Sequence, residues 1–169
     1  MADVKEDRKQ QFSGEVVQVV SFRLGSEEYG VDIAQVQEII RMVEITHVPR
    51  APRFMEGVIN LRGQLIPIID LRTRFGMSRI ASTKSTRIVV TEIGTKRVGM
   101  VVDSVSEVLN IPIENVEDAP EMIAGVGTEY IQGVGKMNDR LIIMLDLTMV
   151  ISGEEKQQLD GVETQFAAS

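Results

Sequence analysis

The sequence contains one strand-rich pattern twice, and this repeat limits the possible folds more than any other feature. Shifting the chain by 69 residues places residues 19–40 on residues 88–109, and a shift of 76 places 54–71 on 130–147. The longer second shift puts seven extra residues within 110–129. The coinciding positions include Gly25 and Gly94, Gly30 and Gly99, Val36 and Val105, Glu38 and Glu107, Gly57 and Gly133, and Asp70 and Asp146.

Each copy of the repeat predicts a small β-barrel. The copies span about 16–75 and 85–150, and each contains about five short aliphatic runs separated by glycine turns. Valine and isoleucine favour strands, and five short antiparallel strands bury a core best by curling into a barrel. We therefore expect an all-β fold of two tandem five-stranded barrels, one from each copy. The barrels form interleaved subdomains of a single domain, 16–151, with a groove between them.

Three further features concern the two ends of the chain and one strand. Residues 1–15 are polar and charged, which is typical of a flexible arm. Ser152 to Glu155 reads as a capping box, and Leu159, Val162 and Phe166 follow at helical spacing, so 152–169 is predicted to contain a C-terminal α-helix with a tail. Pro67, within an apolar run, predicts an edge strand or a bulge.

The composition argues against most enzyme classes. There is no cysteine and only one histidine, His47, so disulfides, thiol catalysis and multi-histidine metal sites are excluded. No nucleotide-binding or zinc-protease motif occurs. Asp70 and Asp146 end equivalent strands, which indicates structural caps rather than catalytic carboxylates. We expect no enzymatic activity, no catalytic residues, no cofactor and no metal.

The charge distribution suggests a surface that meets more than one partner. The net charge of −7 divides into −4 for residues 1–40, +7 for 41–99 and −10 for 100–169. A basic segment in a small barrel raises a nucleic-acid-binding module as one alternative. The negative net charge and the 4% aromatic content argue against it, since neutralising phosphates needs positive charge and stacking on bases needs aromatic side chains. No apolar run approaches a membrane span and no signal core occurs, so a cytoplasmic location is expected.

Several motifs resemble the CheW-like family of bacterial chemotaxis. They are LGSEEYGVDIAQVQEI and VINLRGQLIPIIDLRTRFG in the first copy, and RVGMVVDSVSEVLNI and TEYIQGVGKMNDRLIIMLDL in the second. The family also includes the regulatory domain of the CheA histidine kinase, but this chain has no room for kinase domains. The resemblance implies SH3-like barrels and a non-enzymatic adaptor that couples methyl-accepting receptors to CheA at receptor arrays. A scaffold for a different chemosensory-type kinase pathway remains the alternative.

Arg62 and Glu38 are the polar residues that we expect to matter most. Arg62 occupies a hairpin turn whose counterpart in the second copy is Met137-Asn138-Asp139, ordinary turn residues. An arginine adds a charged donor fork that the turn does not need, and the family uses a matching arginine near its receptor surface. Glu38, repeated as Glu107, lies among apolar neighbours and is predicted to pair with Arg62 or with a basic group of a partner.

The resemblance also implies two sets of contact residues. Receptor tips are helical hairpins that dock between the barrels, and a helix in a groove needs aliphatic anchors with a polar rim. The predicted receptor-binding residues are Val36, Glu38, Ile39, Arg62, Val105 and Val108. The kinase domain has the same double-barrel fold, which predicts contact between barrel ends. The predicted kinase-binding residues are Ile45, Gln64 and Leu65, with Glu117 and Met122 in the insert region as a second surface.

Overall fold

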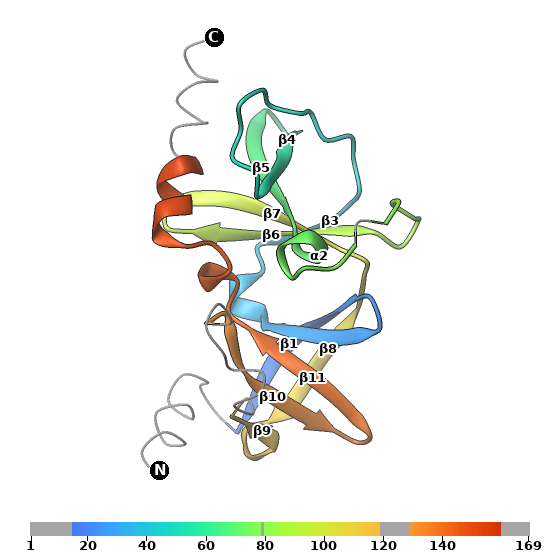
Figure 1. The fold of residues 1–169 in the computed structure, drawn as a ribbon. Helices are drawn as coiled ribbons and strands as arrows, with labels where there is room; N and C mark the ends of the chain where they lie inside the picture. The colour runs from blue at the N-terminus through green and yellow to red at the C-terminus, as the bar shows by residue number, and fades with distance from the viewer. Residues whose placement is uncertain (1–14, 79, 119–128, 160–169) are drawn as a thin grey trace.

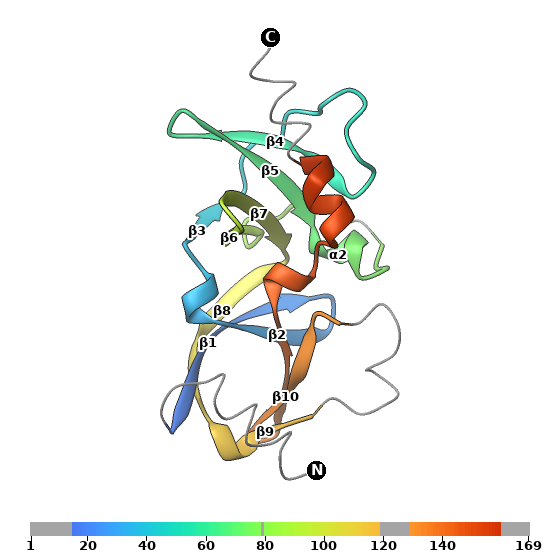
Figure 2. The same cartoon turned by 90° about the vertical axis from the view of Figure 1, so that its left-hand side faces the viewer.

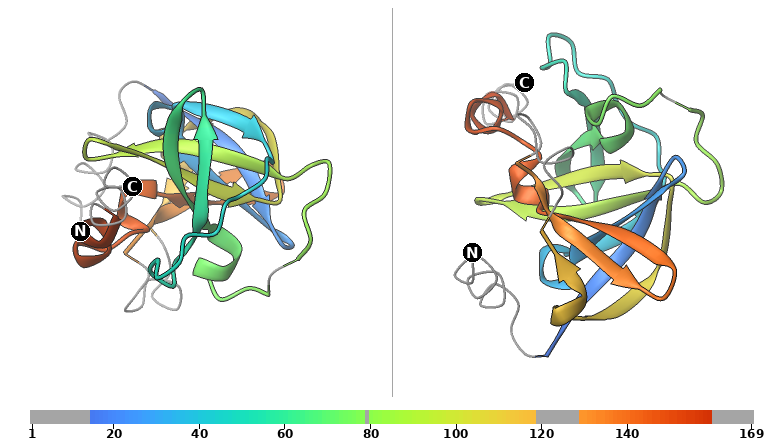
Figure 3. Two further views of the ribbon diagram at one scale, coloured as in Figure 1. Left: turned by 90° about the horizontal axis from the view of Figure 1, so that it is seen from above. Right: turned by 60° about the horizontal axis from the view of Figure 1, so that its bottom comes forward.

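Two sheets, one above the other, make up the structure. The computed structural model describes residues 15–78, 80–118 and 129–159, and most of them lie in strands. Figure 1 shows one sheet in the upper half and the other in the lower half, and the views of Figure 3 show that the two overlie one another. We call the lower sheet barrel A and the upper sheet barrel B.

Barrel A closes because one segment supplies both of its edges. Its strand order is β8-β1-β2-β11-β10-β9. The first and last strands belong to the continuous segment 104–117, bent at the short 3-10 helix η2 (Ile113–Asn115). The strands are β1 (Val16–Leu24), β2 (Glu27–Asp32), β8 (Ser104–Pro112), β9 (Val116–Glu117), β10 (Ile131–Met137) and β11 (Arg140–Leu145).

Barrel B is built in the same way, in the order β3-β6-β7-β5-β4. Residue Thr46, downstream of β3, bridges Val58 of β4, which joins the two edges. The strands are β3 (Glu38–Arg41), β4 (Met55–Leu61), β5 (Gln64–Asp70), β6 (Arg87–Ile93) and β7 (Lys96–Val102). The all-β fold with two barrels is therefore confirmed, although barrel A has six strands where five were expected, because the short β9 adds a sixth.

The expectation that each copy of the repeat forms its own barrel is wrong. Barrel A contains β1 and β2 of the first copy with β8 to β11 of the second, whereas barrel B contains β3 to β5 of the first with β6 and β7 of the second. In each copy, the chain crosses to the other barrel after the second strand. Strands of one copy therefore pair with strands of the other. The first crossover passes through the 3-10 helix η1 (Ile33–Gln35), and the second passes through Asp103.

The apolar residues form three clusters, one inside each barrel and one between them. Val19 and Ile142 are buried inside barrel A, and Ile88 and Ile66, their repeat equivalents, are buried inside barrel B. The largest cluster lies between the sheets and contains equivalent residues of both copies. These include Val20 and Val89, Leu24 and Ile93, Ile69 and Leu145, and Leu71 and Leu147. Two small sheets thereby share one core that neither would bury alone.

One repeated glycine pair is required by close packing across the barrel interiors. A Cβ atom on Gly99 would lie 2.6 Å from Ile68 Cδ1, and one on Gly30 would lie 2.9 Å from Ile142 Cγ2. Both distances are shorter than ordinary van der Waals contact, so any side chain here would displace the core. The repeat keeps glycine at both positions for the same steric reason.

The strand ends are capped as the sequence suggests. Asp70 accepts a hydrogen bond from the backbone N of Arg72 at the start of α2 (Leu71–Arg74), and Asp146 accepts one from Thr148 at η3 (Leu147–Met149). After η3, a helix begins at residue 153 and is described to 159. Ser152 and Glu155 exchange side-chain-to-backbone hydrogen bonds of 2.9 and 3.1 Å, which confirms the capping box. Leu159 is buried, while Val162 and Phe166 lie outside the described residues.

Pro67 does not mark an edge strand, because β5 lies between β4 and β7 in barrel B. Proline is tolerated there because the pairing with β7 begins only at Ile68, one residue later. The missing N–H at Pro67 therefore removes no hydrogen bond from that ladder.

Candidate interaction surface

Arg62 lies at the tip of the β4–β5 hairpin in a left-handed backbone conformation. Its φ is +52°, and its repeat equivalent Asn138 has a φ of +55° in the β10–β11 turn. The neighbouring Asn60 side chain accepts a 2.8 Å hydrogen bond from the backbone N of Gly63 and helps to fix the turn. Asparagine adopts this conformation readily and arginine does not. The turn therefore gains nothing locally from the arginine, which points to a role for its side chain.

The Arg62 guanidinium pairs with Glu38 on β3, as predicted. Nη2 of Arg62 donates to the two carboxylate oxygens of Glu38 at 2.5 and 2.9 Å. The hydrogen bond to Arg62 lowers the pKa of the Glu38 carboxyl, and the same contact raises the pKa of Arg62. The Arg62 side chain stays 66% exposed, against 24% for Glu38. Because only Nη2 bonds to Glu38 and the side chain is exposed, the other N–H groups of Arg62 are available to a partner. Solvent-exposed pairs of this kind add little to stability, so the pair is better explained by recognition than by folding.

A wider polar network surrounds this pair, and our sequence reasoning missed it. Arg97 on β7 lies 3.9 Å from Glu38 and donates to the side-chain oxygens of Gln37 and Gln64 at 2.9 and 3.1 Å. Gln37 in turn donates to Glu92 at 2.6 Å. The repeat contained a signal for it, because Arg97 is the equivalent of Glu28 and so reverses the charge at a shared position.

Barrel A carries a related network at the equivalent place. Arg140, the counterpart of Gln64, donates to Glu107 at 3.0 Å and to Glu28 at 2.5 and 3.1 Å. Glu28 is only 7% exposed and also accepts from Ser21 at 2.9 Å. These hydrogen bonds, that of Arg140 above all, lower the pKa of Glu28 against the opposing effect of burial. Both strand glutamates thus pair with an arginine, but only the barrel B pair includes an arginine at a turn tip.

The four predicted receptor-binding aliphatic residues divide into two kinds. Val36 and Val105 are partly buried against the central cluster and contribute to the shared core. Ile39 on β3 and Val108 on β8 are 39% and 51% exposed and occupy equivalent positions of the repeat. In Figure 2, β3 lies on the left of the upper barrel and β8 on the left of the lower one. The two strands that carry the exposed pair therefore lie on the same side of the molecule in this view, one in each barrel.

The two predicted sets of kinase-binding residues lie on different barrels. Gln64 and Leu65 are exposed at the start of β5, where Gln64 accepts a hydrogen bond from Arg97, whereas Ile45 packs partly buried against the interior of barrel B. Glu117 lies on the other barrel, in β9, and pairs with Lys136 at 3.1 Å. Met122 falls outside the described residues.

Two further observations bear on the function. Within the described ranges, no three histidine, aspartate or glutamate side chains are grouped so that they could hold a metal ion. No helix there has both the length and the apolar character needed to cross a bilayer.

Comparison with known proteins identifies the family. The family model described as CheW-like domain matches residues 18–155. The chain is 40% identical to chemotaxis protein CheW of Klebsiella aerogenes over 89% of this chain and 92% of that protein. Chemotaxis protein CheW of Thermotoga maritima is 35% identical over 86% of this chain and 93% of its own length.

A solved structure agrees with these matches. The crystal structure of the scaffolding protein TtCheW from Thermoanaerobacter tengcongensis superposes with a TM-score of 0.75 and 38% sequence identity. The superposition covers 83% of this chain and 97% of that one. With two interleaved barrels, the repeated strand glutamates and family matches over nearly the whole domain, the chain belongs to the CheW-like family of chemotaxis scaffold proteins.

Proposed function

We propose that this protein is a non-enzymatic adaptor that couples the cytoplasmic tips of methyl-accepting chemoreceptors to the CheA histidine kinase. It acts in the cytoplasm and reaches receptor arrays through these partners, without a cofactor and without contact with nucleic acid. The receptor-binding surface comprises Arg62, Glu38, Ile39 and Val108, with Val36 and Val105 beneath it. The kinase-binding surface includes Gln64 and Leu65.

The observation that carries the proposal is the placement of Arg62. The side chain is two-thirds exposed, stands in a backbone conformation better suited to asparagine, and is oriented by Glu38 through two hydrogen bonds. Orientation by an acidic neighbour fixes the guanidinium plane before a partner arrives and reduces the entropy lost on binding. Ile39, next to Glu38 on β3, and Val108, at the equivalent position on β8, supply the apolar contact that a helical hairpin needs.

The test replaces Arg62 with the residue that the repeat itself uses at this position. Arg62→Asn keeps the left-handed turn, as Asn138 does in barrel A, but removes the guanidinium. We expect at least a tenfold loss of affinity for a soluble fragment of the receptor tip, corresponding to one hot-spot residue. The melting temperature should be unchanged. Binding is measured by titration calorimetry.

A second measurement separates the two proposed surfaces. Arg62→Asn should still bind the isolated regulatory domain of CheA, because the kinase surface does not require the guanidinium. If the wild-type protein binds neither the receptor tip nor the kinase domain, the proposed function is wrong. If Arg62→Asn binds the receptor as tightly as the wild type, the function stands but the receptor surface lies elsewhere.

A further inference from the structure

The chain crosses between the barrels twice at equivalent places of the repeat, and each crossover is held by side-chain hydrogen bonds. The first crossover follows β2 and contains Gln35; the second follows β7 and contains Asp103. Each of these residues bonds to groups of both barrels. We name them the Gln35 clasp and the Asp103 clasp, after the residue at the centre of each.

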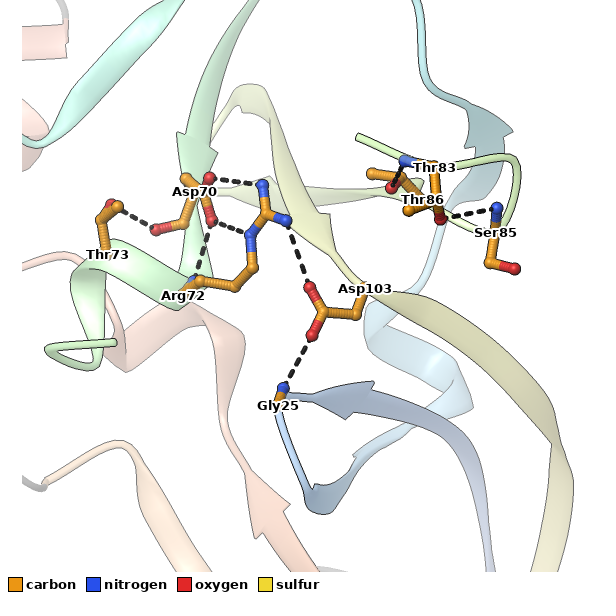
Figure 4. A network of polar contacts seen from close by, with 8 residues as sticks. All are labelled: Gly25, Asp70, Arg72, Thr73, Thr83, Ser85, Thr86 and Asp103. Atoms are coloured by element: carbon orange, nitrogen blue, oxygen red, sulfur yellow. Dashed lines mark hydrogen bonds and ion pairs between the residues drawn. The ribbon is translucent and has the colours of Figure 1, made fainter. Parts of the chain in front are cut away.

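The Asp103 clasp is ionic and partly buried, and Figure 4 shows its contacts. One carboxylate oxygen of Asp103 accepts from Arg72 Nη1 at 3.2 Å, and the other accepts from the backbone N of Gly25 at 2.7 Å. Arg72 belongs to α2 at the end of barrel B, while Gly25 forms the β1–β2 turn of barrel A. Arg72 is oriented by Asp70 through hydrogen bonds of 2.9 and 2.8 Å, and its side chain is 5% exposed.

The Gln35 clasp makes the corresponding link through a neutral side chain, one of whose partners is the Asp146 carboxylate. The Gln35 side chain donates to Asp146 Oδ1 at 2.9 Å and accepts from the backbone N of Leu147 at 2.9 Å, both at the end of β11 in barrel A. Its backbone oxygen accepts from the Thr91 hydroxyl at 2.6 Å, on β6 of barrel B. The two clasps therefore use different residues at equivalent places to do the same thing.

The apolar core between the barrels cannot supply the directional part of this contact. Hydrophobic burial is non-directional, so it resists separation of the barrels but only weakly opposes small rotations that keep the same area buried. Hydrogen bonds weaken steeply when their angle departs from linearity, and charge-assisted bonds are the stronger kind. Clasps on both crossovers thus fix the rotation of one barrel against the other.

We propose that Gln35 and Asp103 are positioning residues that set the relative orientation of the two barrels, and with it the position of Val108 on barrel A relative to the rest of the receptor-binding surface on barrel B. The part that concerns partners rests on the proposed function, in which the receptor-binding surface includes residues of both barrels, whereas Gln64 and Leu65 of the kinase-binding surface lie on barrel B alone. The orientation itself is a property of the isolated chain and is measurable without any partner.

The first experiment measures the distance between the barrels. The chain has no cysteine, so spin labels attach only at two introduced sites, Thr95→Cys in the exposed β6–β7 turn and Asp139→Cys in the exposed β10–β11 turn. Pulsed electron paramagnetic resonance should give one narrow distance distribution. We expect Asp103→Ala combined with Gln35→Ala to broaden or shift it, and each single substitution to do so less.

A control variant distinguishes loss of a clasp from loss of any polar contact. Lys136→Ala breaks an ion pair of 3.1 Å that lies wholly within barrel A, and it should leave the distribution unchanged. Arg72 keeps its bonds to Asp70 in Asp103→Ala, so no unpaired buried cation results. If the double variant does not fold cooperatively, the single variants carry the same measurement. An unchanged distribution in the folded variants would overturn the proposal.

A second experiment examines the consequence for partner binding. In separate titrations, the double variant should bind the receptor tip more weakly than the wild type, because that surface spans both barrels, while its affinity for the regulatory domain of CheA should remain within about twofold. An unchanged receptor affinity together with a broadened distance distribution would show that barrel orientation does not matter for receptor binding. A failure of the wild-type protein to bind the partners would reject the proposed function and leave the distance result intact.

Discussion

At the scale of single residues, two arginines at corresponding hairpins serve different purposes. Arg62 and Arg140 both pair with a repeated strand glutamate, Glu38 or Glu107. Arg140 additionally neutralises Glu28, which is almost fully buried, whereas Arg62 faces solvent. A buried carboxylate that loses its partner is destabilised by the full cost of its desolvation, whereas an exposed carboxylate forms hydrogen bonds with water instead. Arg62 is therefore available for recognition, whereas Arg140 contributes to the stability of the fold.

Arg140→Gln should destabilise the fold much more than Arg62→Asn, although both remove one positive charge. Glutamine is the residue that the first copy has at this position, Gln64, but there the equivalent of Glu28 is Arg97. Glu28 would keep the hydrogen bond from Ser21 but lose both hydrogen bonds from Arg140, so we expect the free energy of unfolding to fall by about 1–3 kcal/mol. Urea unfolding of both variants measures the difference. Equal midpoints for the two variants would contradict this division of roles.

The sequence allowed one of these networks to be predicted and not the other. Comparing the two copies singles out Arg62, because Asn138 shows what the turn alone requires, and Glu38 was predicted to pair either with Arg62 or with a basic group of a partner; the structure shows the first of these. The contacts of Arg97, Arg72 and Asp103 could not be read in the same way. They join β7 to β3 and α2 to a crossover, and these neighbours are known only once the strand order is known.

At the scale of elements, the glycines at the two bulges close the barrels. Gly57 lies at a register shift in β4, and its repeat equivalent Gly133 lies at one in β10. A Cβ atom on Gly57 would lie 2.3 Å from the backbone oxygen of Thr46, at the bridge that joins the edges of barrel B. Its φ of +155° is also unfavourable for any side chain. The Thr46 backbone cannot move aside for an added methyl group as the end of a flexible side chain could.

Gly57→Ala should therefore open the seam of barrel B and lower the free energy of unfolding by about 1–3 kcal/mol. Hydrogen exchange should be accelerated at Thr46 and Val58, whose backbone groups form the bridge. The control is Gly153→Ala, where the added methyl meets nothing within 4 Å. Equal stability of Gly57→Ala and the wild type would show that the seam adjusts without cost.

At the scale of the whole molecule, the repeat predicted the strands but not their partners. Strands β3 and β8 are equivalent, so by sequence pattern either could pair with β1 and bury the same face. Pairing within a copy and pairing between copies both fit the alternation of buried and exposed side chains along the strands. The length of the connection between strands decides which pairing forms. The 3-10 turn η1 carries the chain directly from barrel A to barrel B, so that β3 pairs with β6 and β8 with β1.

The stability of the molecule should be flat between about pH 5 and pH 10 and fall on both sides. Glu28 and Glu155 have their pKa lowered from an ordinary 4.5, mainly through Arg140 for the first and through Arg74, against burial, for the second. A lowered pKa in the folded state contributes stability above the unfolded value, and that contribution is lost as the pH falls through the folded value. Acid therefore breaks the Glu28 pair in barrel A and the Arg74–Glu155 contact that holds the C-terminal helix.

The alkaline side depends on two tyrosines of the aromatic stack Phe22–Tyr29–Phe75–Tyr130 between the barrels. Burial raises the pKa of Tyr29 and of Tyr130 above an ordinary 10.0. A raised pKa contributes stability that is complete below the unfolded value and is lost as the pH rises through the folded value. Thermal melts from about pH 3 to pH 11.5 should show the plateau, and Tyr29→Phe should weaken the alkaline decline while leaving the acid limb unchanged. A melting temperature that stays constant below about pH 4.5 would show that neither carboxylate pair contributes to holding the fold.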